Sequence, residues 1–284
     1  MWGNNGFDLW AKDSTMIPVS VIVVTKNEEK TIAKCLGGLS RFDDIWVIDS
    51  RSQDKTAQIA ENFPVKFQNF EWNGKYPKKR QYCLDNLPLT YDWVFFVDAD
   101  EDIPDKLIDE IESLLSTERM EAGFFITGKY RLQNKILKYG FHNHKISLLH
   151  RGRMEFPVVD DLDILGMGEI EGHYQPIIKA TSSHTKIGKL KNYMIHDALD
   201  DMRAWNFRHE KYAKWEAGMN KKDAWPKDPV PWREKVKSFL RGSKFRAEII
   251  FLTGFVLKCG CLDGQNGLFW AKQRYKYINK INRL

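Results

Sequence analysis

The stretch WVFFVDADED (93–102) carries four carboxylates directly after a run of apolar residues. Asp98 and Asp100 are two residues apart, so their side chains point the same way if they end an extended strand. Two neighbouring carboxylates repel each other unless a cation lies between them. Mg²⁺ prefers oxygen ligands and usually takes one or two protein carboxylates, while diphosphate oxygens fill its shell. We therefore interpret Asp98 and Asp100 as the site of a divalent cation and a diphosphate.

A second explanation is that these acids only cap the helix that follows. We accept it for Asp102, because Pro104 and an apolar stripe over 107–115 indicate that a helix begins there. For Asp98 and Asp100 we favour ligand binding, because they follow a wholly apolar strand and ligands bind at the carboxyl ends of such strands.

The elements that would position these acids alternate between strand and helix. Apolar, β-branched runs predict buried strands, and the stretches between them show helical spacing. Asn27 is expected to cap the first helix. Four repeats of this alternation predict a doubly wound α/β layer, with Asp49 and Asp98 at the carboxyl ends of strands. The predicted strands of this half are 19–24, 45–50, 65–70 and 93–98.

The second half is expected to complete a mixed sheet and then to become helical. Polar loops separate three more strand-like runs, and a stretch rich in His, Trp and Tyr over 191–219 predicts a helix. His209, Tyr212 and Glu216 recur at helical spacing, so they share a face that either meets the ligand or packs against the body. The predicted strands of this half are 123–132, 145–150 and 176–183.

A proline-rich segment (225–232) is typical of a linker, and the chain beyond it is basic. From residue 232 to 284 there are twelve Lys or Arg and three Asp or Glu, a charge of +9, while the other residues sum to −3. Basic helices with aromatic faces lie in the headgroup layer of membranes. We expect an α/β domain over 1–220 and a helical, membrane-facing extension over 221–284. The alternative is a helical pair packed on the body.

The chain shows no sign of export or of membrane spans. Its first sixteen residues lack a basic region followed by an apolar run, so no signal peptide is expected. The apolar run 249–257 is shorter than the roughly 20 residues that a span requires. The cysteines lack the spacing of a zinc site, which favours free thiols in a reducing cytosol. We expect a cytoplasmic protein, peripheral on the inner face of the plasma membrane. A basic aromatic tail can also bind nucleic acid, but no recognition motif is present and we expect no such partner.

Four stretches in order resemble the nucleotide-sugar domain of family 2 glycosyltransferases of the inverting GT-A type. They are VSVIVVTKNEEKTIAKCL, WVIDSRSQDKT, KKRQYCLDN and WVFFVDADE. The later stretch HDALDDMRAWNFRHEKYAKWEA, with GCLDGQNGLFWAKQRYKY in the tail, resembles a bacterial subgroup that builds lipopolysaccharide cores and surface polysaccharides. The resemblance implies a GT-A fold, a Rossmann-like, doubly wound mixed sheet with a C-terminal helical extension. It also implies Mg²⁺ or Mn²⁺ and transfer of a sugar, expected from a UDP-sugar, to a hydroxyl of a glycan or lipid-linked glycan with inversion.

The resemblance also implies roles for individual residues. The segment after the first strand would meet the nucleotide base, and the acid that ends the second strand would meet the base or ribose. The family usually shows Asp-Gly-Ser after that strand, whereas this chain has Arg51 between two serines, where it could meet a phosphate. Asp100 would bind the metal, beside Asp98 and with His184 as a further ligand. The expected donor-binding residues are Thr25, Asn27, Glu28, Asp49, Arg51, Lys79, Arg80, Gln81 and Asp98.

Inverting transfer is a single displacement in which the acceptor hydroxyl loses its proton as it attacks, so a positioned base is required. The resemblance places this base in the acidic loop 153–163. Related enzymes tend to show Pro-Val-His-Glu there, and Pro157-Val158-Val159-Asp160 aligns with that pattern, with Val159 in place of His and Asp160 in place of Glu. We expect Asp160 to be the base, with Asp161 as the second candidate; the alternative is a solvated acidic turn.

Two other functions are compatible with a doubly wound sheet and an acidic strand end. A sugar-1-phosphate nucleotidyltransferase also uses a doubly wound sheet and Mg²⁺, but it needs a glycine-rich loop after the first strand, and TKNEEKT has no glycine. A non-catalytic glycan- or lipid-binding protein of the same fold would be marked by loss of the acid pair, and here both acids are present.

Overall fold

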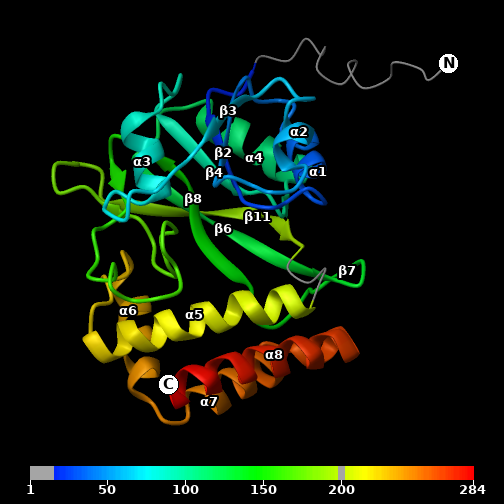
Figure 1. Cartoon of the computed structure of the whole chain (residues 1–284), viewed down its shortest axis with the longest axis vertical. Helices are drawn as coiled ribbons and strands as arrows, with labels where there is room; N and C mark the ends of the chain where they lie inside the picture. The colour runs from blue at the N-terminus through cyan, green and yellow to red at the C-terminus, as the bar shows by residue number, and fades with distance from the viewer. Residues whose placement is uncertain (1–15, 198–201) are drawn as a thin grey trace.

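The computed structural model describes residues 16–197 and 202–284. Its centre is a nine-stranded sheet with the order β3-β2-β1-β4-β8-β6-β11-β5, in which β7 pairs with β6 (Figure 1). The strands are β1 Ser20–Thr25, β2 Asp44–Asp49, β3 Lys66–Asn69, β4 Trp93–Asp98, β5 Glu101–Asp102, β6 Glu121–Leu132, β7 Lys135–Ile136, β8 Asn143–His150 and β11 Lys186–His196. A separate two-stranded ribbon joins β9 Met154–Glu155 and β10 Ile177–Ile178.

The described residues form eight α-helices, some of which pack on the sheet while the others follow it in the chain. They are α1 Ile32–Gly37, α2 Thr56–Ala60, α3 Lys79–Asn86, α4 Asp105–Leu115, α5 Met202–Lys222, α6 Pro231–Gly242, α7 Arg246–Leu252 and α8 Gly264–Arg283. A π-helical turn (Thr253–Leu257) and a 3₁₀ turn (Gly260–Asp263) connect α7 to α8. No helix in residues 16–197 and 202–284 has the length and apolar character needed to cross a membrane.

Both faces of the sheet are covered, as the nearly continuous apolar strands predict. Helices α1, α2 and α4 bury residues such as Leu36 and Leu107 on one face. Helix α3 buries Cys83 and Leu84 against Ile22 on the other face. The predicted doubly wound α/β architecture with C-terminal helices is therefore confirmed.

The strand directions bring several carboxyl ends to one side of the sheet. β1, β2 and β4 are parallel. β8 is antiparallel to β4 and to β6, and β11 is parallel to β6, so β11 runs in the same direction as β4. We call the side where β1, β2, β4 and β11 end the carboxyl edge, and the opposite side the amino edge.

Two predicted helix starts differ from the structure. α1 begins at Ile32 rather than at a cap on Asn27, whose backbone is left-handed (φ 56°) and whose Oδ1 accepts a hydrogen bond from the Gln53 backbone at 2.8 Å. α4 begins at Asp105 without a side-chain cap. Asp102 instead forms ion pairs of 2.8 Å with Lys34 and Arg131, which compete for its carboxylate.

The helix predicted over 191–219 begins later, and its first residues are a strand. β11 continues to His196 because residues 193–196 pair with residues 127–130 of β6. This long-range pairing overrides local composition. The strand predicted over 176–183 is reduced to the two residues of β10.

The C-terminal helices lie side by side below the sheet (Figure 1). α8 packs on α5 and α7 through a cluster that includes Ala213, Ala247 and Ile278. Trp270 of α8 is buried against Leu132 and Leu137 of the β6–β7 region. α7 and α8 thus match the packed alternative, whereas α6 buries none of its residues.

Close packing of α8 gives a stability prediction. A Cβ on Gly267 would lie 1.9 Å from the Gly260 carbonyl oxygen, so Gly267→Ala must displace backbone. We expect a loss of roughly 1–3 kcal/mol in the free energy of unfolding, the usual cost of overpacking. Gly37→Ala is the control, because nothing lies within 4 Å of its Cβ. Equal urea midpoints for the two variants would contradict this packing.

Candidate active site

Asp98 is held between two cations at the carboxyl edge. Its carboxylate lies 2.7 Å from Arg80 Nη2 and 2.6 Å from Lys145 Nζ. Lys145 also binds the buried Glu101 at 2.8 Å, and Glu101 Oε2 accepts a hydrogen bond from the Asp98 backbone. Burial alone would raise the pKa of Asp98, but Lys145 and Arg80 outweigh it and hold the pKa far below its usual range. Asp98 is therefore charged in the folded protein.

Asp100 faces a different set of groups. His196 reaches it from the end of β11, with Nδ1 3.3 Å from Asp100 Oδ1. Burial lowers the pKa of His196, but Asp100 and Glu101 outweigh it and raise the pKa to about 9. Burial, followed by the charge of Asp100, raises the pKa of Glu28 to about 7. Glu28, Asp100 and His196 therefore share one electrostatic environment.

These groups fit a divalent cation that is shared with a ligand. Within the described ranges, no three His, Cys, Asp or Glu side chains converge into a metal site made by protein alone. A hard cation bound with a diphosphate needs only one or two protein ligands. The buried His196 Nδ1 lies 3.3 Å from Asp100 Oδ1 and 4.0 Å from Glu101 Oε1, and it makes no well-formed hydrogen bond among the described residues. Asp100 is therefore the group that fits the cation, and His196 Nδ1 can become a second ligand only after it loses its proton.

The structure corrects the expected role of His184. It precedes β11, whose first residue pairs with Glu121 at the amino edge, and its charge affects His150 there. His196 ends the same strand at the carboxyl edge. An eleven-residue strand separates its ends by roughly 30 Å, so His184 cannot share a cation with Asp100 in this fold.

Residues that follow β1 and β2 form the next part of the edge. Asp49 is buried and accepts hydrogen bonds from the Ser52 backbone (2.7 Å) and hydroxyl (2.5 Å), which shapes the loop after β2. The buried Thr25 hydroxyl has no partner among the residues described. Arg51 is exposed and pairs with Glu71. Thr25 and Asp49 therefore lie at the edge, while Arg51 projects into solvent.

Helix α3 places three consecutive residues in different roles. Lys79 is buried and contacts the Ser50 hydroxyl, and its Nζ lies 3.0 Å from Glu169. Arg80 binds Asp98, as described above. The Gln81 side chain accepts a hydrogen bond from the Phe156 backbone at 2.7 Å. Lys79 and Arg80 thus contact residues at the carboxyl edge, whereas Gln81 connects α3 to the segment that follows β9.

Helix α5 contributes one wall and several packed polar groups. Burial raises the pKa of Tyr212, which is also influenced by Arg208, Asp100 and Asp98, so this part of α5 faces the carboxyl edge. His209 stacks on Trp205 with ring centroids 3.7 Å apart. The predicted face of α5 therefore divides between the site and the core.

Glu216, further along α5, anchors a half-exposed histidine. It is buried and binds Tyr277 at 2.6 Å, His173 Nδ1 at 2.9 Å and Arg246 at 3.2 Å. Burial would raise the pKa of Glu216, but His173 and Arg246 lower it to about 2. The ring of His173 also meets Tyr212 edge-on at 5.4 Å. Glu216 thus orients the His173 imidazole, which lies beside Tyr212 in the wall of the site.

The two expected base residues have opposite environments. Asp160 is 77% exposed and pairs with Lys222 at 2.8 Å. Asp161 is buried and bound by Lys78 at 2.6 Å, Tyr76 at 2.7 Å and Trp215 at 3.0 Å. Three donors occupy the Asp161 carboxylate, so it holds the loop in place and has no room for a substrate hydroxyl.

Sequence reasoning missed Lys145, Glu101 and the His173–Glu216 pair. The available signal for Lys145 was a lone cation opening the apolar run KISLLH, and for Glu101 its position inside the acidic cluster. Nothing in the sequence connects His173 with Glu216, because the two are 43 residues apart.

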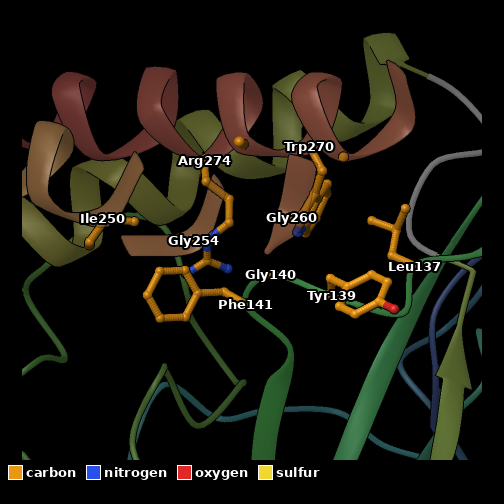
Figure 2. Close-up of a pocket in the computed structure, with 11 residues that line it drawn as sticks. Leu137, Tyr139, Gly140, Phe141, Ile250, Gly254, Gly260, Trp270 and Arg274 are labelled. Atoms are coloured by element: carbon orange, nitrogen blue, oxygen red, sulfur yellow. The ribbon is translucent and has the colours of Figure 1, made fainter. Parts of the chain in front are cut away.

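A small pocket lies elsewhere, between the loop after β7 and the C-terminal helices (Figure 2). Trp270 and Arg274 reach into it from α8, and the Arg274 guanidinium lies 5.3 Å from the Phe141 ring centroid. Tyr130 separates it from the carboxyl edge, because its ring contacts Trp270 on one side and His196 on the other. No acidic side chain lines this pocket, so it is not the candidate active site.

Comparison with known proteins identifies a family domain. Residues 20–158 match the model described as glycosyl transferase family 2. The lipopolysaccharide core biosynthesis glycosyltransferase LpsC of Rhizobium meliloti is 26% identical over 148 residues, which cover 48% of this chain and 52% of LpsC. The uncharacterized glycosyltransferase RC0292 of Rickettsia conorii is 32% identical over 104 residues, or 36% of each chain. The chain thus spans about half or less of the length of these relatives.

Two solved structures show a partial likeness to this chain. TarS of S. aureus has a TM-score of 0.42 at 17% identity, covering 72% of this chain and 43% of TarS. Glucosyl-3-phosphoglycerate synthase of Mycobacterium tuberculosis, solved with Mn²⁺, UDP and glucosyl-3-phosphoglycerate, has a TM-score of 0.33 at 24% identity, covering 46% of this chain and 51% of the synthase. Together with the family match, the mixed sheet and C-terminal helices agree with the GT-A fold class.

The contrast between the two loop aspartates is testable by stability. Asp161→Asn leaves the buried Lys78 without its counter-ion, and breaking a buried pair costs about 3–5 kcal/mol. Asp160→Asn removes only an exposed pair and should change stability by about 0.5 kcal/mol or less. Urea unfolding of the two variants measures the difference. Similar midpoints would show that Asp161 is not structural.

Proposed function

Residues 20–158 belong to glycosyl transferase family 2, and from this premise we propose that the chain transfers a sugar from a UDP-sugar to a hydroxyl of a glycan or lipid-linked glycan, with inversion. The name of the R. meliloti relative, LpsC, supports a place in lipopolysaccharide or surface-polysaccharide synthesis. We also propose that residues 1–220 form the transferase domain, that residues 221–284 form an extension, and that the protein works in the cytoplasm at an anionic membrane surface.

The observation that carries this proposal is the charge arrangement at the carboxyl edge. Asp98 ends β4 and Asp100 lies in the turn that follows, and the two carboxylates face different partners, Arg80 with Lys145 in one case and His196 in the other. A nucleoside diphosphate requires cations, and this edge offers them from three separate elements. Asp100 would hold Mg²⁺ or Mn²⁺, with His196 as a second ligand once it has lost its ring proton, and the chemistry of this ion is to neutralise charge that develops on the leaving diphosphate.

The chain's own residues would bind and orient the donor. Thr25, Glu28 and Asp49 lie where β1 and β2 end, the place at which α/β sheets bind nucleotides. Lys79 and Arg80 stand at the first turn of α3, so they are positioned to contact phosphate oxygens and stabilise them as charge grows.

Asp160 remains the proposed base, because its carboxylate is 77% exposed and only an ion pair at the surface, with Lys222, would have to open for an acceptor hydroxyl to reach it. The His173–Glu216 pair is its competitor. A carboxylate that binds one ring nitrogen leaves the other nitrogen aimed at its substrate, the usual arrangement of a histidine base.

Two alternative functions give different products. A nucleotidyltransferase would release pyrophosphate, and a non-catalytic binding protein would release nothing from any nucleotide sugar. The transferase should slowly release UDP in a cation-dependent reaction. Chromatography of nucleotides after incubation with UDP-sugars and Mn²⁺ separates the three cases.

Donor binding should depend on Asp100. We expect Asp100→Ala to weaken UDP binding in the presence of Mn²⁺ about tenfold or more, which is about 1.4 kcal/mol in calorimetry. The control is Asp92→Ala, an exposed acid at the amino end of the same strand. Unchanged Mn²⁺-dependent affinity in Asp100→Ala would refute the assigned cation site.

Transfer should depend on the base without affecting donor binding. We expect Asp160→Asn to lower turnover by roughly a hundredfold or more while UDP affinity stays unchanged, since a general base acts in the transition state. His173→Gln is made in parallel. Near-normal turnover in Asp160→Asn, with loss in His173→Gln, would reassign the role to the His173–Glu216 pair.

A further inference from the structure

Helix α6 presents its apolar side to solvent. Trp232, Val236 and Phe239 are 66%, 49% and 70% exposed, and their spacing of four and three residues places them on one face of the helix. Phe245, just past the end of α6, is equally exposed. A surface helix of a globular protein normally turns such a face toward the core.

The basic side of α6 faces the body instead. Arg233 and Lys237 bind the buried carboxylate of Asp228 at 3.2 Å and 2.6 Å. The Arg241 guanidinium lies 4.1 Å from the Trp225 ring centroid. Arg233, Lys237 and Arg241 are spaced one helical turn apart, and their contacts hold the charged side of α6 against the body.

Contacts within the protein fix α6 with its apolar face outward. Asp228 is buried and can accept Arg233 and Lys237 only if that side of α6 points inward. Trp225 in turn packs edge-on against the fully buried Trp215 of α5, with ring centroids 5.2 Å apart. The apolar face is therefore held outward by contacts that continue into the core.

We propose that this outward face, consisting of Trp232, Val236, Phe239 and Phe245, docks on an anionic lipid bilayer. Lys235 and Lys244 are exposed beside it, so cationic side chains flank the apolar face. Tryptophan and phenylalanine rings favour the headgroup layer, and lysines beside them favour anionic lipid.

The dimensions of α6 agree with a helix that lies on the surface. Its twelve residues extend about 18 Å, too short to cross a bilayer. α6 would thus be the part of the chain that contacts the membrane. This role rests on the proposed function in one respect, namely that a lipid-linked acceptor lies at such a surface.

Vesicle flotation tests the proposal on the full chain. We expect the protein to float with phosphatidylcholine vesicles that contain phosphatidylglycerol and to bind pure phosphatidylcholine about tenfold more weakly. Phe239→Ser should weaken binding to the anionic vesicles about tenfold, and Trp232→Ser should do the same.

Phe207→Ser is the matched control, because Phe207 is a helical phenylalanine that is 63% exposed in the first half of α5, whereas α6 lies at the other end of that helix (Figure 1). It should keep full binding. Absence of flotation in the wild type, or equal loss in Phe207→Ser and Phe239→Ser, would overturn the proposal. A shift to dimers that Phe239→Ser abolishes, without flotation, would overturn it in favour of a second copy as the occupant.

The test is separable from the proposed reaction. Release of UDP in solution without vesicles should be unchanged in Trp232→Ser and Phe239→Ser, since neither residue lies at the carboxyl edge. Loss of flotation with normal UDP release supports the docking face. Flotation without any UDP release would preserve the docking face and refute the transferase.

Discussion

Three carboxylates at one buried edge of a sheet must be balanced by cations, and this balance organises the molecule. Asp98 and Glu101 share Lys145, Arg80 binds the other side of Asp98, and His196 faces Asp100. The cations come from α3, β8 and β11, which lie far apart in the chain. Each element must therefore be in place before the acids can be buried, since an unpaired buried charge costs several kcal/mol.

The same balance suits the nucleotide sugar that we propose as the donor. Arg80 and Lys145 already neutralise carboxylates, so they are fixed in position before a ligand arrives, and such preorganised charges are effective in stabilising a transition state. Around them, Asp49 shapes the loop after β2 and α5 forms a wall with Arg208 and Tyr212. The candidate site is thus assembled from the ends of strands, with α5 as one wall.

Features that depend on neighbouring residues could be predicted from the sequence, whereas features that depend on long-range pairing could not. Apolar strands ending on Asp49 and Asp98 were predicted because burial and strand ends are encoded by neighbouring residues. The sequence did not reveal that His196, rather than the expected His184, lies at the carboxyl edge, because this depends on the direction and length of β11, which its pairing with β6 decides. The tail shows the same limit: aromatic and basic residues recur throughout it, yet α8 is core and α6 turns its apolar side outward. Whether such a helix packs into the core or exposes its apolar side depends on its packing partners, such as Asp228 for α6.

The account depends most on a cation and a diphosphate meeting at Asp100. A crystal structure with UDP and Mn²⁺, with manganese located by anomalous scattering, tests this directly. We expect the manganese peak at coordination distance from Asp100 and from diphosphate oxygens, with Arg80 or Lys145 contacting the diphosphate. A bound UDP whose manganese lies away from Asp100, with the Asp98 ion pairs unchanged, would contradict the account.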